Sequence, residues 1–407
     1  MSEFFNLGQK QPPLAAHRIR SDEEALAVAR HWAAEFATTA AQRDRERILP
    51  WDVLDGYAAS GLWGITVPRE YGGAGVSSVT LAEVIAIISA ADGSLAQIPQ
   101  NHYYALEVLR VGGTPQQQRF FYDKALQGVR FGNALAEIGH KDYKRRTHLA
   151  PDGDGFRVSG QKFYCTGALY AEWIPTLVVD ADEVSYLAFI PRHSEGISII
   201  DDWDGFGQRV TGSGSVHFDQ VRVERDWIVP FKASFDRPTT IGPFAQILHA
   251  AIDLGQARGA YAATLDYVRE HSRPWVDAGV DKASHDPLLV ERAGQLSVRL
   301  RAAEASLQRA GRILDSAQAL ATPNERDIAE ASVAVAGARV LTTEIALQAG
   351  SQLFELAGSS ATLAEHNLDR FWRNARTHTL HDPVRWKFHA VGNYVLNDTL
   401  PPRHGAL

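Results

Sequence analysis

Two histidines that stand three residues apart, His378 and His381, are the groups in this sequence best suited to moving a proton. Imidazole titrates near neutral pH, so its neutral form accepts a proton or a hydrogen bond and its protonated form supplies one. If the segment is helical, this spacing places both rings on one face. A histidine in isolation is more often structural than catalytic, so the residues around the pair must decide its role.

The remaining histidines do not show the pattern of a metal site. They lack the i, i+4 histidine–glutamate arrangement of a zinc site, and a single cysteine, Cys165, excludes a multi-cysteine site. We therefore expect no metal. The scattered histidines are His140, His217, His249, His271, His285, His366 and His389.

The size and charge of the chain limit its partners. Its 407 residues, 45% hydrophobic and 22% charged, are enough to bury a large core in two or three lobes. The net charge of -7 has its signs interspersed, which argues against nucleic acid and anionic membrane as partners. The first ten residues lack the pattern of a secretory signal, and no apolar run approaches the roughly 20 residues of a membrane span. We expect a cytoplasmic protein.

Sulfur-containing residues are nearly absent, since Met1 is the only methionine and Cys165 the only cysteine. Chance or genome bias explains this as readily as synthesis under sulfur limitation. We expect Cys165 to be a small buried apolar residue rather than a reactive thiol.

The order of the expected elements is helices, then strands, then helices. Apolar spacing and glycine-rich turns predict an N-terminal helical domain over residues 1–130, with a first helix that carries Leu26, Ala29, Trp32, Ala33 and Phe36 and further helices at Trp51–Ser60, Ser78–Ala91 and Pro115–Gln127. Serine at position 21 and Glu24 form an expected capping box before the first of these helices.

Short β-branched or aromatic runs separated by turn residues predict a middle β domain over residues 131–235. Turn pairs such as Asp152-Gly153 and Asp154-Gly155 favour hairpins, and so an antiparallel sheet. The expected strands lie at Phe156–Val158, Leu177–Val179, Tyr186–Ile190, Ile197–Ile200 and Ser215–Phe218.

Residues 236–407 are expected to form a C-terminal helical bundle. Apolar residues from Leu289 to Leu314 recur alternately every four and three positions, which makes one seam along a long helix. A second long helix is expected from Glu325 to Leu356, ending at Gly358. Seam residues hold helices together and carry no chemistry.

Four segments carry a resemblance to a known family. Residues 61–73, 160–167 and 207–219 resemble the N-terminal turn, the flavin-contacting strand and the following turn of the acyl-CoA dehydrogenase superfamily. The fourth, residues 370–383 with the sequence RFWRNARTHTLHDP, resembles the flavin-dependent monooxygenase branch around dibenzothiophene monooxygenase and the SfnB-type sulfur-acquisition oxidoreductases. The resemblance implies a mainly α fold, with an N-terminal helical domain, a middle antiparallel β domain and a C-terminal four-helix bundle.

The resemblance also implies an activity. Members of this branch use reduced FMN and oxygen, through a C4a-hydroperoxyflavin, and the expected substrate here is a small organosulfur compound such as dimethyl sulfone. No Gly-x-Gly-x-x-Gly follows a strand, so a separate NAD(P)H:flavin reductase is expected to deliver the reduced flavin. Proteins that resemble this chain are usually homotetramers in which the bundle of one subunit helps to close the flavin site of a neighbour.

The motif matches assign residues to the flavin. Thr166 matches a residue that faces the flavin N5 edge, and Tyr164 stands where dehydrogenases place a tryptophan. Asn133 lies in the loop along the pyrimidine edge, and Arg273 matches an arginine on the flavin phosphate. Ser359 and Ser360 replace a glycine pair that faces the pyrophosphate of FAD, which favours FMN. The matched loop and strand add Ala136, Lys162 and Phe163 as cofactor-binding candidates.

The catalytic candidates implied by the resemblance are His381, His378, His102 and Thr166, and His381 is a cofactor-binding candidate as well. His381 is the principal candidate, because an imidazole near the flavin C4a can hydrogen-bond the peroxide and supply a proton as the O–O bond breaks. His102 falls in the helical region on the substrate side, where a structural role is an equally good interpretation.

Other functions remain open on the sequence. One alternative is an FAD-dependent acyl-CoA dehydrogenase, in which Asp382 would replace the usual glutamate base although it is one methylene shorter. A monooxygenase that hydroxylates an amine or an aromatic compound is another. A flavin-binding protein without turnover is the third.

Overall fold

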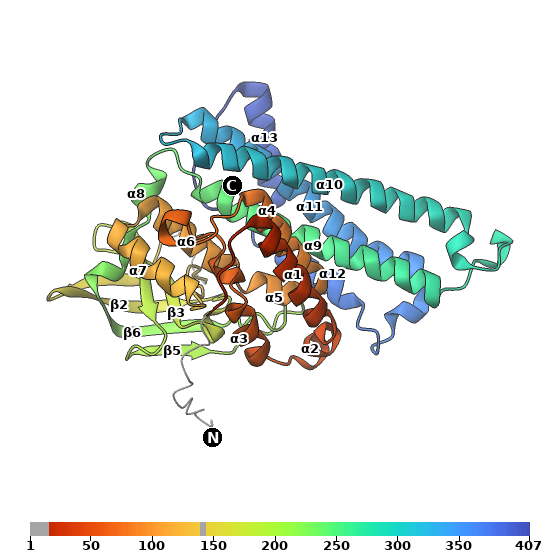
Figure 1. The fold of residues 1–407 in the computed structure, drawn as a ribbon, viewed down its shortest axis with the longest axis horizontal. Helices are drawn as coiled ribbons and strands as arrows, with labels where there is room; N and C mark the ends of the chain where they lie inside the picture. The colour runs from red at the N-terminus through yellow and green to blue at the C-terminus, as the bar shows by residue number, and fades with distance from the viewer. Residues whose placement is uncertain (1–15, 139–143) are drawn as a thin grey trace, which may run out of the picture.

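The computed structural model describes residues 16–138 and 144–407 and begins with a lobe of helices (Figure 1). Ser21 caps the first helix by accepting a hydrogen bond from the backbone N–H of Glu24, 3.2 Å away. The Glu24 carboxylate accepts from the backbone of Arg20, so only half of the expected capping box forms. The helices are α1 (Asp22–Ala37), α2 (Ala40–Glu46), α3 (Trp51–Ala59), α4 (Ser78–Ala91), α5 (Gly93–Gln97), α6 (Gln100–Gly112) and α7 (Pro115–Leu126).

A seven-stranded sheet follows, in the order β5-β6-β2-β1-β3-β4-β7. Most neighbours are antiparallel, but β1 and β3 run parallel, so the expectation of an antiparallel sheet is wrong and the sheet is mixed. The hairpin signal of Asp152-Gly153 and Asp154-Gly155 is confirmed by the β1–β2 pair, and β3–β4 is a further antiparallel pair. The β2–β3 connection returns the chain in the same direction as β1. The strands are β1 (His148–Asp152), β2 (Gly155–Lys162), β3 (Trp173–Val179), β4 (Ser185–Pro191), β5 (Ile197–Ile200), β6 (Ser215–Val223) and β7 (Ile228–Pro230).

The rest of the chain is helical and is built around three long helices. The apolar seam is confirmed on the second of them, where Leu296, Leu300 and Leu307 are buried. The helices are α8 (Lys232–Phe235), α9 (Ile241–Glu270), α10 (Pro287–Ala319), α11 (Glu325–Ala357), α12 (Asp369–His378) and α13 (Val384–Asn397). None of the helices in the described ranges is long and apolar enough to cross a membrane.

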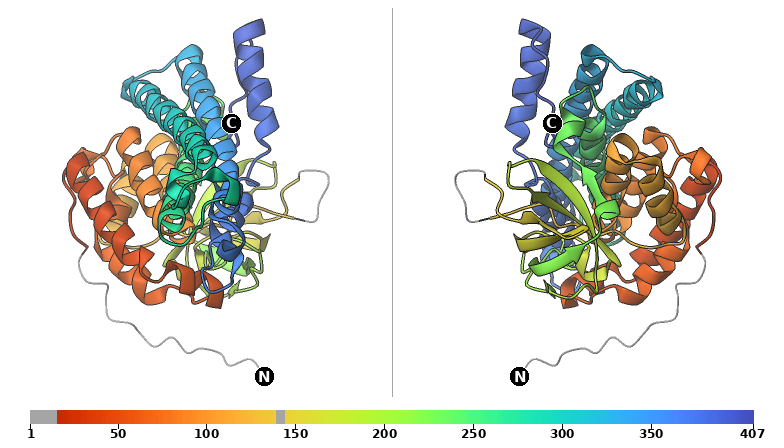
Figure 2. Two further views of the ribbon diagram at one scale, coloured as in Figure 1. Left: turned by 90° about the vertical axis from the view of Figure 1, so that its right-hand side faces the viewer. Right: turned by 90° about the vertical axis from the view of Figure 1, so that its left-hand side faces the viewer.

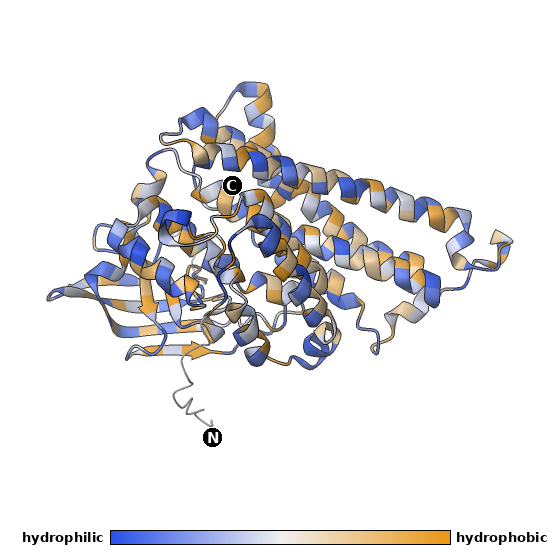
Figure 3. Cartoon of the chain, viewed as in Figure 1, coloured by the Kyte–Doolittle hydropathy of each residue, from blue (hydrophilic) through white to orange (hydrophobic). Residues whose placement is uncertain are grey.

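The sheet and the far end of the long helices lie at opposite ends of the molecule (Figures 1 and 2). Figures 1 and 2 show the sheet at one end of the molecule and the α9–α10 turn with the end of α11 at the other, with α13 projecting from the body. Hydrophobic residues are interspersed with polar ones along the long helices (Figure 3). On α10 the hydrophobic residues that face the other helices form the buried seam. The predicted domain limits 1–130, 131–235 and 236–407 stay a prediction.

Candidate active site

The short helix α5 joins the sheet to the bundle and brings the candidate residues together. Gln97, at its end, lies with Nε2 3.3 Å from Nε2 of His381. On the other side, Gly167 has φ +75° and packs so closely that a Cβ there would lie 3.2 Å from the carbonyl oxygen of Ile98. The turn that carries Thr166 therefore borders α5. The loop that carries His381 borders the same helix.

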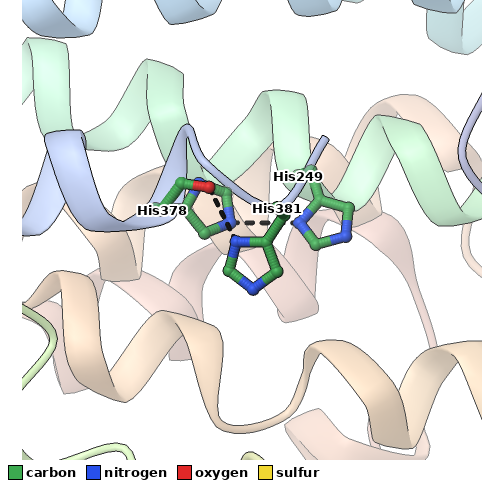
Figure 4. Close-up of side chains that lie close together, drawn as sticks. All are labelled: His249, His378 and His381. Carbon is green, nitrogen blue, oxygen red and sulfur yellow. Dashed lines mark hydrogen bonds between the residues drawn. The ribbon is translucent and has the colours of Figure 1, made fainter. Parts of the chain in front are cut away.

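Three imidazoles from two elements of the bundle meet beside α5 (Figure 4). We call His249, His378 and His381 the histidine cluster. Nδ1 of His249, on α9, lies 3.1 Å from Nε2 of His378, at the end of α12. Nδ1 of His381 lies 2.7 Å from the backbone oxygen of His378. One nitrogen from each ring falls within 4.8 Å of the other two.

A buried ion pair stands behind the cluster. Nδ1 of His378 lies 2.5 Å from Oδ1 of Asp253, and the other carboxylate oxygen accepts from Arg339 and Thr343. Burial raises the pKa of Asp253, and the guanidinium and hydroxyl oppose that shift. Burial, with His381 and Arg339 nearby, holds the pKa of His378 well below its ordinary value. Burial and the other two imidazoles do the same to the pKa of His249.

His381 is the member of the cluster that meets solvent. Its side chain is exposed, yet burial by the surrounding protein lowers its pKa. Protein therefore surrounds the ring while part of its surface stays accessible. Its Nδ1 donates to a carbonyl, so Nε2 of the neutral ring accepts from the amide of Gln97.

A one-way chain of hydroxyls fixes the polarity of Thr166. Thr211 donates its only hydroxyl proton to the carbonyl of Gln208, at 2.9 Å. The Ser213 hydroxyl, 2.6 Å from that of Thr211, must then donate to it, and Thr166, 2.7 Å from Ser213, must donate to Ser213. Because each hydroxyl has one proton, the oxygen of Thr166 is left as an acceptor.

Asn133 and Tyr164 carry the features of an incomplete binding site. Nδ2 of Asn133 donates to the backbone oxygen of Tyr164, while its Oδ1 is buried without a partner among the described residues. Tyr164 has φ +52°, and its side chain is 52% exposed. A buried acceptor without a donor is costly, which points to a ligand that supplies an N–H or O–H.

Three further cofactor candidates, Ala136, Lys162 and Phe163, make their hydrogen bonds within the chain. Lys162 is fully buried, and its Nζ lies 2.6 Å from Oε1 of Glu137. Burial lowers the pKa of Lys162 to about 8. Phe163 and Ala136 are joined by a backbone hydrogen bond of 3.0 Å. The ion pair occupies Lys162 and disfavours its role as a side-chain ligand of a cofactor.

His102 lies in the core and not at the cluster. Its Nε2 donates to the backbone oxygen of Trp63 at 2.8 Å, and its Nδ1 accepts from the backbone of Phe131 at 3.1 Å. The side chain is fully buried, and burial lowers its pKa to about 3. With both nitrogens engaged, His102 has none to offer a substrate, so this geometry favours the structural interpretation. Cys165 is buried as expected, and burial raises the pKa of its thiol to about 12.

Arg273, Ser359 and Ser360 lie together at the opposite end of the molecule. We call these three residues the bundle tip. The α9–α10 turn and the end of α11 are tied by a 2.9 Å hydrogen bond from Ser272 to the backbone of Ala357. All three bundle-tip residues are exposed, and Ser360 accepts from Tyr267 at 3.0 Å. The predicted flavin site is therefore divided between two distant surfaces of one chain (Figure 1).

Asp382 faces a cation. Its Oδ2 lies 3.7 Å from Nζ of Lys387, on α13. The second carboxylate near the histidines, Asp253, is fully buried beneath Arg339. Neither carboxylate is a free base.

Sequence reasoning missed several residues of this site. His249 was placed among the scattered histidines, and that assignment is wrong, because it faces His378. Asp253 and Arg339 gave no local signal, since each lies on a long helix whose apolar neighbours predict packing alone. The recurrence His249–Asp253, four residues apart on α9, was the one available sign of a shared face.

Comparison with known proteins gives two family models and several full-length relatives. The acyl-CoA dehydrogenase N-terminal domain matches residues 21–129, and the acyl-CoA dehydrogenase C-terminal domain matches residues 247–386. Dibenzothiophene monooxygenase of Rhodococcus erythropolis is 35% identical over 94% of this chain and 96% of its own. The "probable FMNH2-dependent monooxygenase SfnC" of Pseudomonas putida is 34% identical over 93% of this chain and 96% of its own.

Solved structures agree with these matches. FMN-bound TdsC from Paenibacillus sp. A11-2 superimposes with a TM-score of 0.91 at 31% identity, covering 94% of this chain and all of that one. The methanesulfinate monooxygenase MsuC from Pseudomonas fluorescens gives a TM-score of 0.87 at 32% identity, covering 94% of this chain and 99% of that one. The mainly helical fold with a central sheet, expected from the sequence, is confirmed.

Proposed function

The chain belongs to the acyl-CoA dehydrogenase family, in which it is a flavin-dependent monooxygenase, and we propose that it transfers one oxygen atom of O2 to a small organosulfur compound. The observation that carries the proposal is the histidine cluster: neutral imidazoles, rather than a free carboxylate, lie at the end of α5, which also borders the turn that carries Thr166. Relatives that act on dibenzothiophene and methanesulfinate support sulfur as the atom oxygenated.

The residues present fit FMN as the cofactor. Reduced FMN, when bound, supplies the two electrons that let oxygen react. The acceptor-only oxygen of Thr166 matches an N–H on the flavin edge, and the unpartnered Oδ1 of Asn133 can accept a second one. The FMNH2-dependent relative SfnC supports a separate flavin reductase as the source of the reduced flavin.

His381 holds the proton that the reaction needs when the O–O bond breaks, and supplies it at that step. Its lowered pKa keeps the ring neutral at physiological pH, so it can accept a hydrogen bond at Nε2 before chemistry and give up a proton once it has taken one. Gln97 can serve both states, because its amide offers either an N–H or an oxygen to Nε2. His378 then orients His381 through its backbone oxygen.

The bundle tip supplies the phosphate end of the site to a neighbouring subunit. Arg273 is exposed and lies far from Thr166 in its own chain, so a flavin at Thr166 can reach an arginine of this kind only on another copy (Figure 1). Exposed apolar residues of the projecting α13 (Trp386, Phe388, Val395 and Leu396) fit contact with such a copy. A homotetramer would place each bundle tip against the sheet end of a neighbour.

The test is oxygen uptake with regenerated reduced FMN against a panel of sulfides, sulfones and sulfinates. We expect one sulfur compound to raise oxygen uptake and to yield a product one oxygen heavier. An amine or a phenol as the only productive compound would move the oxygenated atom to nitrogen or carbon. A preparation that retains FAD and is bleached by an acyl-CoA would instead support the dehydrogenase.

A further inference from the structure

The histidine cluster is connected to the bundle interior by a continuous line of polar contacts. It runs from Arg339, on α11, to Asp253 and His249, on α9, by way of His378. Arg339, Asp253 and His378 are fully buried, and 8% of His249 is exposed. Solvent therefore reaches this line only at its His249 end.

The direction of every hydrogen bond in the line follows from its first member. A guanidinium is always charged, and its charge favours the ionised form of the carboxyl beside it, so Asp253 accepts from Arg339 as a carboxylate. The proton between Asp253 and His378 then belongs to Nδ1 of His378. A neutral His378 with its proton on Nδ1 has a lone pair on Nε2, so the bond to His249 is donated by Nδ1 of His249.

The arrangement leaves Nε2 of His249 as an acceptor, for which the described residues provide no partner. Nε2 of His381 is also an acceptor, because its Nδ1 donates to the backbone oxygen of His378. The two rings lie with centroids 4.8 Å apart. Two neutral imidazoles of the same tautomer therefore stand side by side, and one residue, His378, orients both.

We propose that His249 is a second proton-accepting residue of this site and that Asp253, backed by Arg339, is the positioning residue that fixes the tautomers of His378 and His249. The role of His249 rests on the proposed function, whereas the tautomers do not. A proton that arrives at the site is taken on Nε2 of His249 or of His381, and the ring that takes it keeps its Nδ1–H bond. The second ring stays neutral, because two adjacent positive charges repel.

Charged and titratable groups on every neighbouring element bear on this balance. Besides the other two histidines, His249 is faced by Asp253 on its own helix, Arg339 from α11, and Lys387 from α13, which pairs with Asp382. The acid limb of the pH profile of coupled turnover therefore reports the titration of all these groups together. The effect of one variant must accordingly be compared with that of a matched control variant.

The first experiment reads the tautomers without flavin. In protein labelled with 15N-histidine, two-bond correlations distinguish a ring protonated on Nδ1 from one protonated on Nε2. We expect Nδ1–H for both His249 and His378 at pH 7, with assignment by His249→Asn and His378→Asn. A proton on Nε2 of either ring would overturn the proposed line. This outcome does not depend on any substrate.

The second experiment separates the two nitrogens of His249. Asparagine places an N–H near the position of Nδ1, so His249→Asn keeps the bond to His378 and removes the outer acceptor. We expect at least a 10-fold loss of coupled turnover with the FMN dissociation constant within twofold of the parent's. Unchanged turnover in a parent that oxygenates a sulfur compound would remove His249 from the reaction.

The third experiment tests Asp253 while keeping the buried charge balanced. In Asp253→Asn/Arg339→Met the amide can accept from or donate to His378, so both tautomers become allowed. We expect a mixed 15N pattern for His378 and a shifted acid limb. Thr343→Val is the control, since Thr343 donates to the same carboxylate at 2.9 Å without setting its charge; it should leave pattern and profile unchanged. An unmixed pattern in the folded double variant would overturn the role of Asp253.

Discussion

The histidine cluster and the bundle tip differ in how much of a site one chain provides. In the cluster each ring has at least one nitrogen held by a neighbour from the same chain, and an ion pair between α9 and α11 fixes the arrangement. In the bundle tip Arg273 and Ser359 are exposed, and only Ser360 is held, by Tyr267. Groups that take part in a reaction need a fixed geometry. A cation that binds a phosphate needs only to lie close to it, and a neighbouring subunit can provide it.

The difference predicts distinct losses. Changes in the cluster should affect chemistry or folding and leave flavin affinity nearly intact. Changes in the bundle tip should affect flavin affinity and be rescued by an intact neighbour.

Acid should destabilise the protein through buried neutral histidines, and this is the largest effect expected. Burial depresses the folded-state pKa values of His249, His378 and His102, the last to about 3. Below about pH 6.5 the unfolded chain takes up protons that the folded chain refuses, so stability falls as pH falls, by up to about 4 kcal/mol per pH unit for three groups. Urea unfolding from pH 7 to 5 measures this slope.

The control for the acid effect is His102→Gln, which removes one of the three groups without touching the cluster. The slope should then fall by about 1.4 kcal/mol per pH unit. A slope equal to that of the parent would show that His102 takes up its proton in the folded state.

His381→Ala should lower coupled turnover by about 100-fold, since it removes the accessible proton carrier. The FMN dissociation constant should stay within about twofold, because no bundle-tip residue changes. Oxygen uptake and product formation, measured together, check this. Unchanged coupled turnover would exclude His381 from the reaction.

Arg273→Ala should weaken FMN binding by about 10-fold, the value of a charge-assisted hydrogen bond of roughly 1.4 kcal/mol. Turnover at saturating FMN should be retained. Mixing this variant with His381→Ala under conditions that exchange subunits should restore activity, because some sites then combine an intact cluster with an intact tip. Failure to restore activity in demonstrated hybrids would place both regions in one subunit's site.

The sequence predicted several elements, among them Ser78–Ala91, but neither β1 nor β7, and few of the contacts between elements. The seam around Leu300 follows from spacing alone, because burial of one face leaves a helical period in the sequence. The parallel β1–β3 pairing did not, because register between distant strands leaves no local mark. Asp253 and Arg339 are 86 residues apart, and only the packing of α9 on α11 makes them a pair. The roles assigned to His381, Thr166 and Arg273 stay predictions.

Ser213→Ala should have a smaller effect, on the choice between reduced and oxidised FMN. Without Ser213 the Thr166 hydroxyl loses the acceptor that holds its proton and can donate outward instead. An outward donor suits an unprotonated ring nitrogen, so preference for reduced FMN should fall by about fivefold, within the usual value of one neutral hydrogen bond. Dissociation constants for both redox forms under anaerobic conditions measure this, and an unchanged ratio would contradict the acceptor role of Thr166.

Removing divalent metal should have the smallest effect. The result distinguishes a histidine cluster that binds a metal from one that is ordered by hydrogen bonds alone. Three imidazole nitrogens within 4.8 Å match the reach of a metal ligand set, and His378 even has the carboxylate partner typical of a metal-bound histidine. However, the same lone pairs serve the hydrogen bonds that order the cluster: the one on Nε2 of His378 accepts from His249, and the one on His381 faces Gln97. Dialysis against EDTA should therefore leave coupled turnover and the 15N-histidine pattern unchanged. Loss of both on EDTA treatment and their return with Zn2+ would mean that a metal, and not Asp253, sets the protons of these rings.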